Sequence, residues 1–118
     1  MSKILIVDDD SVTVSLLEML LELDGFTVLI ARRGADVLPK VAEDKPDLIM
    51  IDYHLTDIAG VEVIKDLRAH ADFKDIPIVM ASGMDMSVEA MEAGADKFII
   101  KPFEPSDLPD LFNRLISE

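Results

Sequence analysis

The stretch Ile4-Leu5-Ile6-Val7-Asp8-Asp9-Asp10 joins a short apolar run to three consecutive aspartates. The run is rich in Ile and Val and does not alternate with polar residues, which is typical of a strand buried on both faces of a parallel sheet. Four more runs of this kind follow, at residues 27–31, 48–51, 77–81 and 98–100. The stretch therefore predicts the first strand of a five-stranded parallel sheet.

Segments with helical spacing separate these runs. In the first segment, the apolar residues 12, 16, 19, 20 and 23 are expected to share one face of a helix, and Gly25 predicts its end. The same spacing predicts helices around residues 61–68, 88–92 and 108–115. Strands that alternate with helices predict an α/β, doubly wound (βα)5 fold, and a length of 118 residues fits a single domain over residues 1–118.

Two prolines constrain the second and fifth helices. Pro39 and Pro109 fall where these helices would already have begun, and a proline inside a helix removes a backbone donor and crowds the preceding turn. We therefore expect both helices to start late, with Asp36 and Asp107 as their N-caps.

Composition and charge exclude several classes of function. The chain has no cysteine, which excludes a disulfide scaffold, a thiolate zinc site and thiol catalysis. No apolar run approaches the roughly 18–20 residues of a membrane helix, and the N-terminal run is too short for a signal peptide, so we expect a cytoplasmic protein without a membrane partner. A net charge of −13 argues against nucleic acid and suits a cation, a basic partner surface or solubility alone, and charge by itself favours the last of these.

Polar side chains follow four of the predicted strands. Asp8 and Asp9 follow the first, Asp52 the third, Ser82 the fourth and Lys101 the fifth. Each residue alone is usually a turn, a cap or a solvated side chain. Because the carboxyl ends of parallel strands lie along one edge of the sheet, we expect these five to meet in one pocket.

The chemistry of this pocket favours phosphoryl transfer. Adjacent carboxylates repel one another unless a cation neutralises them, and Mg²⁺ suits a site with few protein carboxylates. A lysine and a hydroxyl beside Mg²⁺ can stabilise the charge on phosphoryl oxygens. A carboxylate in the same pocket can attack phosphorus and form an acyl phosphate.

Four stretches, at residues 4–10, 47–52, 76–82 and 94–103, together resemble the receiver domain of response regulators in two-component signalling, including the chemotaxis regulators. The resemblance covers the whole chain and implies the strand order 2-1-3-4-5 with helices on both faces of the sheet. It also implies a phosphoacceptor signalling domain, not an enzyme in the usual sense, although such a domain promotes its own phosphorylation and dephosphorylation.

The resemblance assigns a role to each residue of the pocket. Asp52 would accept a phosphoryl group from a sensor histidine kinase or a histidine phosphotransfer protein. The implied Mg²⁺ site consists of Asp9, Asp52, the backbone carbonyl of His54 and, through a water molecule, Asp8. The groups implied to contact the phosphoryl group are Lys101, Ser82 and Gly83. The peptide bond between Lys101 and Pro102 is expected to be cis.

The resemblance also implies a switch and an output surface. Movement of Ser82 would let the ring of Phe98 turn inward, changing the face formed by the fourth helix, the fifth strand and the fifth helix. A downstream protein would bind this face, whose acidic rim would include Glu89, Glu92 and Asp96. His54 and Met84 would tune dephosphorylation. We expect a monomer or weak dimer.

Three features depart from the commonest family pattern. Thr56 stands where the family usually has proline, Ala59-Gly60 stands where it usually has Asp-Gly, and Gly83 stands where it usually has alanine. None of them replaces one of the acidic residues, Ser82 or Lys101. The departures therefore bear on the rigidity of the loops and on the lifetime of the phosphorylated state.

Two alternatives remain at this point. The stretch from Asp8 to Val12 also fits the motif of haloacid-dehalogenase-type phosphatases, with Asp8 as nucleophile, but that interpretation leaves Asp52 unexplained and lacks an acidic pair after Lys101. A receiver-like domain that is not phosphorylated usually lacks one of these acids or the lysine. We further expect a stand-alone receiver, because no linker follows the last helix.

Overall fold

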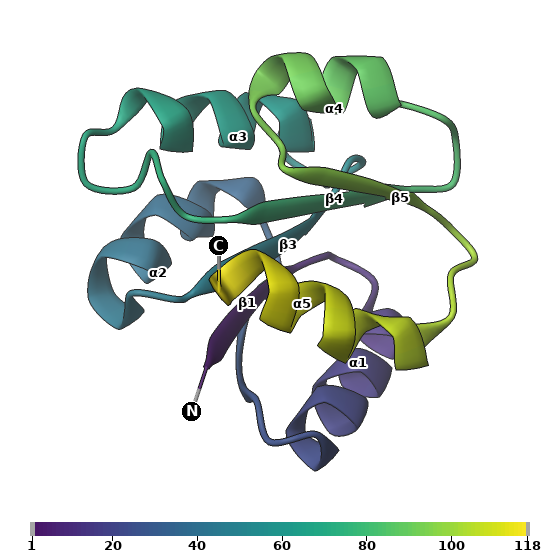
Figure 1. The fold of residues 1–118 in the computed structure, drawn as a ribbon. Helices are drawn as coiled ribbons and strands as arrows, with labels where there is room; N and C mark the ends of the chain where they lie inside the picture. Colours follow the sequence, from purple (N-terminus) through teal and green to yellow (C-terminus); the bar gives the residue numbers. More distant parts are fainter. Residues whose placement is uncertain (1, 118) are drawn as a thin grey trace.

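The computed structural model describes residues 2–117, which form a five-stranded parallel sheet between two layers of helices (Figure 1). The strands are β1 (Lys3–Val7), β2 (Thr27–Ala31), β3 (Leu48–Asp52), β4 (Ile78–Ser82) and β5 (Lys97–Ile100). Their order across the sheet is β2-β1-β3-β4-β5, and every neighbouring pair is parallel. The predicted fold class and strand order are confirmed.

Each strand is followed by a helix. The helices are α1 (Ser11–Leu23), α2 (Val37–Asp44), α3 (Gly60–Ala69), α4 (Ser87–Ala93) and α5 (Leu108–Ser117). Helices α1 and α5 cover one face of the sheet, and α2, α3 and α4 cover the other (Figure 1). Each face therefore has its own apolar core. None of the helices within residues 2–117 is long and apolar enough to cross a membrane.

The prediction that all strands are buried on both faces is correct only for the centre of the sheet. Strands β1, β3 and β4 are buried almost throughout, whereas in β2 only Ala31 is fully buried. In β5, both Lys97 and Ile100 are exposed. The reason is position in the sheet, because β2 and β5 are its edge strands and the helices cover them only in part.

The expected apolar face of α1 is not the face that packs on the sheet. The buried residues of α1 are Val14, Leu17 and Leu21. Leu20 is half-buried, and the exposed apolar residues are Val12, Leu16, Met19 and Leu23, with Val12 and Leu23 more than 70% exposed. Because α1 carries apolar side chains on two faces, spacing alone located the helix but not its buried side.

Helices α2 and α5 start late, as the prolines require. A 3₁₀ turn precedes each of them, Gly34–Asp36 before α2 and Pro105–Asp107 before α5. Pro39 is thus the third residue of α2 and Pro109 the second of α5, near the helix start where the missing N–H costs little. Asp36 occupies the N-cap position of α2, as predicted, but its carboxylate makes no capping hydrogen bond and instead pairs with Arg33 at 3.4 Å.

Helix α3 begins without a side-chain cap. Its N-cap position is Ala59, whose backbone is extended, with φ −69° and ψ 140°. That conformation is the one in which an Asp, Asn or Ser side chain accepts a hydrogen bond from the first turn. A methyl group cannot accept one, so the side chain of Ala59 caps nothing. Two N–H groups of the first turn find backbone partners instead, that of Gly60 at the carbonyl of Tyr53 (2.8 Å) and that of Glu62 at the carbonyl of Ala59 (3.0 Å).

We expect Ala59→Asp to stabilise the fold by about 1 kcal/mol, because the new carboxylate would cap α3 and lie near the positive end of its dipole. Urea unfolding of both proteins measures the difference. Ala59→Asn is the matched variant that caps without adding charge. If neither variant is more stable than the natural chain, other groups already accept hydrogen bonds from the N–H groups in the first turn of α3.

Candidate functional site

The polar side chains predicted to meet do lie at one edge of the sheet. Asp8 follows β1 directly, Asp52 ends β3, Ser82 ends β4 and Lys101 follows β5. The register pairs Val7 with Ile51, Asp52 with Ala81, and Ser82 with Ile100. All four strands thus end at the same level, which brings together residues far apart in the sequence.

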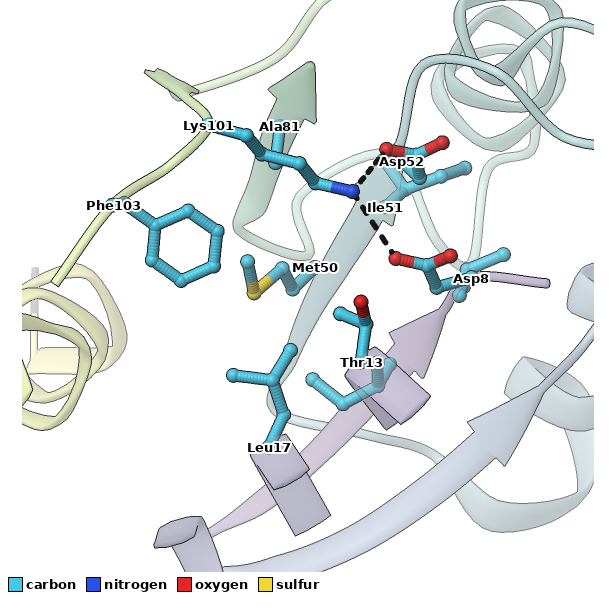
Figure 2. Close-up of a pocket in the computed structure, with 11 residues that line it drawn as sticks. Asp8, Thr13, Leu17, Met50, Ile51, Asp52, Ala81, Lys101 and Phe103 are labelled. Carbon is cyan, nitrogen blue, oxygen red and sulfur yellow. Dashed lines mark hydrogen bonds and ion pairs between the residues drawn. The ribbon is translucent and has the colours of Figure 1, made fainter. Parts of the chain in front are cut away.

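Lys101 connects the two buried carboxylates (Figure 2). Its Nζ lies 2.7 Å from Oδ1 of Asp52 and 3.4 Å from Oδ2 of Asp8. The backbone N–H of Lys101 donates to the carbonyl of Ser82 at 2.8 Å, which fixes the start of the side chain at the end of β4. The Lys101–Pro102 peptide bond is cis, as expected. A charged group from β5 is therefore fixed between the ends of β1 and β3.

The site rests on an apolar floor. Leu17, Met50 and Phe103 lie beneath the charged groups (Figure 2). The side chains of Asp8 and Asp52 are only 8% and 11% exposed, so water reaches them poorly. The pair of carboxylates is therefore held where charge is costly, and Lys101 is the cation that offsets this cost.

The pKa values follow from this arrangement. Burial raises the pKa of the Asp8 carboxyl, and the charge of Asp52 adds to the rise, while the Asp10 N–H and Lys101 oppose it. Burial lowers the pKa of the Lys101 ammonium, but its hydrogen bond to Asp52 and the charges of Asp52 and Asp8 raise it overall. The surroundings therefore favour the charged form of Lys101 and disfavour the charged form of Asp8.

Asp9 is not part of this ion pair. Its backbone carbonyl accepts a hydrogen bond from Nη2 of Arg32 at 3.1 Å, and Oδ2 of its carboxylate accepts one from the hydroxyl of Thr56. Within residues 2–117, no group of three His, Asp or Glu side chains is arranged to hold a metal ion. The three predicted carboxylates, those of Asp8, Asp9 and Asp52, lie at the same edge of the sheet, but they do not converge in this structure.

The donor chemistry nevertheless fits a hard cation. Asp8 and Asp52 are neighbouring carboxylates, and the pKa of Asp8 is raised chiefly by burial, with the charge of Asp52 adding to the rise, so a further positive charge beside them would be favourable. All nearby donors are oxygens, which Mg²⁺ prefers. In this structure Oδ2 of Asp9 is engaged by the hydroxyl of Thr56, and both oxygens of Asp52 are engaged by Lys101 and the N–H of His54.

Ser82 and its neighbours line the side of the site nearest β4. The Ser82 side chain is fully buried, and its Oγ accepts a hydrogen bond from the N–H of Met84 at 3.2 Å. Gly83 is exposed, and Met84 is 58% exposed. His54 is also exposed, and its N–H donates to Oδ2 of Asp52 at 3.1 Å, so both oxygens of Asp52 are hydrogen-bonded.

The predicted switch and rim residues have different surroundings. Phe98 is half-buried and packs against the apolar core on the side of α2, α3 and α4. Glu89 and Glu92 are exposed. Asp96 is not a free rim residue, because its Oδ2 accepts hydrogen bonds from Arg68 at 2.9 Å and from the N–H of Ile78 at 2.8 Å. The sequence could not show this partner, which is 28 residues away in α3.

Arg68 connects α3 to the end of α4. Its Nε donates to the carbonyl of Gly94 at 2.9 Å, and its Nη1 donates to the carbonyls of Lys74 and Ile76. Gly94 has φ +117°, and a Cβ there would lie 2.7 Å from Cγ of Arg68. The glycine thus ends α4 and makes room for the arginine.

Asp57 is a polar residue that sequence reasoning missed. Its Oδ1 accepts a hydrogen bond from the N–H of Gly34, and its Oδ2 accepts one from the N–H of Ala35, both at 2.9 Å. The N–H groups of Ala35 and Gly34 lower the pKa of the Asp57 carboxyl. The departures at Thr56 and Ala59 marked this loop as unusual, but nothing in the sequence pattern pointed to the turn before α2 as the partner of Asp57.

Comparison with known proteins identifies relatives of this chain. A family model described as "Response regulator receiver domain" matches residues 4–113. The transcriptional regulatory protein PrrA of Mycobacterium tuberculosis is 38% identical over 109 residues, which cover 90% of this chain and 46% of PrrA. The chain thus spans about half the length of the curated relatives it matches.

Solved structures show the same fold. A putative response regulator from Chloroflexus aurantiacus has a TM-score of 0.93 and 32% identity, with 99% of this chain and 98% of that chain covered. The receiver domain of sensor histidine kinase PA1611 from Pseudomonas aeruginosa has a TM-score of 0.90 with 99% and 98% covered. At 23% identity, this second likeness concerns the fold alone.

We expect Gly60→Ala to disturb the site and to destabilise the fold by about 2–3 kcal/mol. A Cβ at Gly60 would lie 2.4 Å from the carbonyl oxygen of Asp52 and 2.9 Å from Cε of Met80, so the end of β3 would have to shift. Gly83→Ala is the control, since a Cβ there would meet no described atom within 4 Å. Equal stability of the two variants in urea unfolding would contradict this close contact.

We expect Asp8→Asn to be more stable than the natural chain at about pH 7. The folded state holds the Asp8 proton to higher pH than the unfolded state does, so the stability of the natural chain falls as pH rises above the ordinary value of 3.8. The advantage of the variant should therefore shrink toward about pH 4. Urea unfolding at several values between about pH 4 and pH 7 measures the difference in stability between the variant and the natural chain. Asp66→Asn, at an exposed position, is the control. If the variant is less stable at neutral pH, the hydrogen bonds of the Asp8 carboxylate to Lys101 and to the N–H of Asp10 stabilise the fold by more than its burial destabilises it.

Proposed function

The chain belongs to the family of response regulator receiver domains, and from this premise we propose that Asp52 is the residue that carries the phosphoryl group. A domain of this family is a phosphoacceptor in two-component signalling. The observation that best supports Asp52 is the ammonium of Lys101, 2.7 Å from its carboxylate at the end of β3. We further propose that residues 1–118 form one such domain, with a histidine kinase or a histidine phosphotransfer protein as donor.

The proposed reaction moves a phosphoryl group between two side chains. The carboxylate of Asp52 attacks the phosphorus of a phosphohistidine, the P–N bond breaks, and the imidazole leaves with the bonding electrons and takes up a proton. The N–H of His54 and the ammonium of Lys101 hold one oxygen of Asp52 each, so the carboxylate is oriented before the donor arrives. Lys101 can then pair with the phosphoryl oxygens as negative charge leaves the carboxylate.

We propose that Mg²⁺ binds beside Asp52. Its ligands would be the carboxylates of Asp9 and Asp52 and the backbone carbonyl of His54, with Asp8 acting through a water molecule. When bound, the ion supplies positive charge that offsets the charge of the carboxylates and of the phosphoryl oxygens. The crowding of Asp8 and Asp52 around Lys101 supports the proposal. The Pseudomonas receiver domain, which shares the fold, has a magnesium ion coordinated in its own active-site cleft.

The return reaction and the output use residues at the mouth of the site. We propose that water attacks the phosphorus of the acyl phosphate, so that inorganic phosphate leaves and the Asp52 carboxylate is regenerated, and that the exposed side chains of His54 and Met84 tune the access of this water. Ser82 and Gly83 would bind the phosphoryl group. For Ser82 this would end its hydrogen bond to Met84 and open space for the ring of Phe98. We propose that the surface of α4, β5 and α5 then binds a downstream protein.

The net charge of −13 supports a basic protein surface as the partner, not nucleic acid. PrrA is a transcriptional regulatory protein, but the match covers less than half of it, so DNA binding is not carried over. The phosphatase alternative with Asp8 as nucleophile is not favoured, because the family match accounts for Asp52 and Lys101 together.

We expect acetyl phosphate and Mg²⁺ to label the chain with an acid-labile acyl phosphate on Asp52. Asp52→Asn should abolish the label, Asp8→Asn should weaken it through poorer metal binding, and Asp66→Asn, on the exposed side of α3, should leave it unchanged. Borohydride reduction followed by peptide mapping identifies the labelled residue. A label on Asp8 would contradict the proposal and favour the phosphatase alternative.

A further inference from the structure

Asp9 lies between loops that follow three neighbouring strands. It belongs to the loop after β1, its carbonyl accepts a hydrogen bond from Arg32 after β2, and its carboxylate accepts one from Thr56 after β3. The hydroxyl of Thr56 occupies Oδ2 of the carboxylate. A residue proposed to bind a cation is thus already engaged by two groups of this chain.

A second set of contacts fixes the loop that carries Thr56. The next residue, Asp57, accepts hydrogen bonds from the N–H groups of Gly34 and Ala35, each at 2.9 Å. Ile58 packs on the same turn so closely that a Cβ at Gly34 would lie 2.5 Å from its Cγ1. The loop is therefore attached to the turn before α2 by two hydrogen bonds and an apolar contact.

Together these contacts form a ring of hydrogen bonds. It runs from Asp9 to Thr56, through Asp57 to Gly34, and back through Arg32 to Asp9. The carboxylate of Asp9 enters this ring through the exposed hydroxyl of Thr56. Thr56 is joined directly to Asp57, which accepts hydrogen bonds from the turn before α2.

The Thr56–Asp9 bond and cation binding need the same carboxylate. Within residues 2–117 the acidic side chains are not grouped for a metal ion. Of the three carboxylates proposed to surround the cation, those of Asp8 and Asp52 contact Lys101, whereas that of Asp9 accepts a hydrogen bond from the hydroxyl of Thr56. A cation that takes Oδ2 of Asp9 as a ligand would compete with this hydroxyl. Proline, usual here in the family, has no hydroxyl to compete.

We propose that Thr56 is a positioning residue that holds the Asp9 carboxylate out of the cation-binding arrangement, so that cation binding opens the ring and is reported at the turn before α2. This inference rests on the proposed Mg²⁺ site. A hydrogen bond of this kind weakens Mg²⁺ binding by about three- to tenfold.

The test compares the Mg²⁺ dissociation constants of the natural chain, Thr56→Val and Thr56→Ser, measured by calorimetric titration. Valine has the shape of threonine without its hydroxyl, and serine keeps the hydroxyl. We expect Thr56→Val to bind Mg²⁺ about three- to tenfold more tightly and Thr56→Ser to bind like the natural chain. Thermal unfolding checks that all three are folded. Equal or weaker binding by Thr56→Val would overturn the inference.

NMR supplies a second readout that a merely structural role would not change. In the natural chain, Mg²⁺ should shift the amide signals of Gly34 and Ala35, which contact Asp57. In Thr56→Val these signals should already lie near their Mg²⁺-bound positions before the ion is added. Signals that do not respond to Mg²⁺ in the natural chain would overturn the coupling to α2.

The outcomes separate this inference from the proposed function. If Asp52 is labelled in the presence of Mg²⁺ but Thr56→Val binds the ion no more tightly, the role of Thr56 is wrong and the phosphoacceptor stands. If none of the three proteins binds Mg²⁺, the proposed metal site and the role of Thr56 are both wrong.

Discussion

The ammonium of Lys101 lies between the carboxylates of Asp8 and Asp52, and the rest of the site is arranged around these two ion pairs. Two carboxylates on neighbouring strands repel each other, and their apolar floor makes the repulsion stronger than in water. A cation must therefore reach them from elsewhere in the chain. The strand order provides it, because β4 separates β3 from β5 and Lys101 spans that distance with its long side chain.

Apolar burial in the two cores offsets the unfavourable free energy of placing these charges in a poorly hydrated site. On the side of α1 and α5, Phe112 is completely buried and meets Phe26 edge to face, with ring centroids 6.1 Å apart. On the other side, Ile64 and Leu67 of α3 are equally buried. Burial of each such side chain contributes roughly 1.5–3 kcal/mol to the stability of the fold, so a few of them offset one poorly solvated charge at the edge of the sheet.

The sequence predicts what depends on local pattern and strand order. The central strands, the late start of α2 and the meeting of Asp8, Asp52 and Lys101 follow from apolar runs, prolines and the geometry of parallel sheets. It does not predict the partner of a side chain when several are within reach. Asp9 bonds to Thr56, and Asp96 bonds to Arg68, because of packing between segments that no periodicity connects. Edge position likewise decides the exposure of β2 and β5.

Helix α1 carries two apolar faces that share no residue. Val14, Leu17 and Leu21 fill the core, whereas Val12 and Leu23 belong to the outer, exposed face. A change on the outer face opens no cavity, so its effect on folding is small. Over evolutionary time the two faces can therefore diverge separately. The inner face is constrained by folding, while the outer face can vary in size and chemistry from one descendant to the next without loss of the native state.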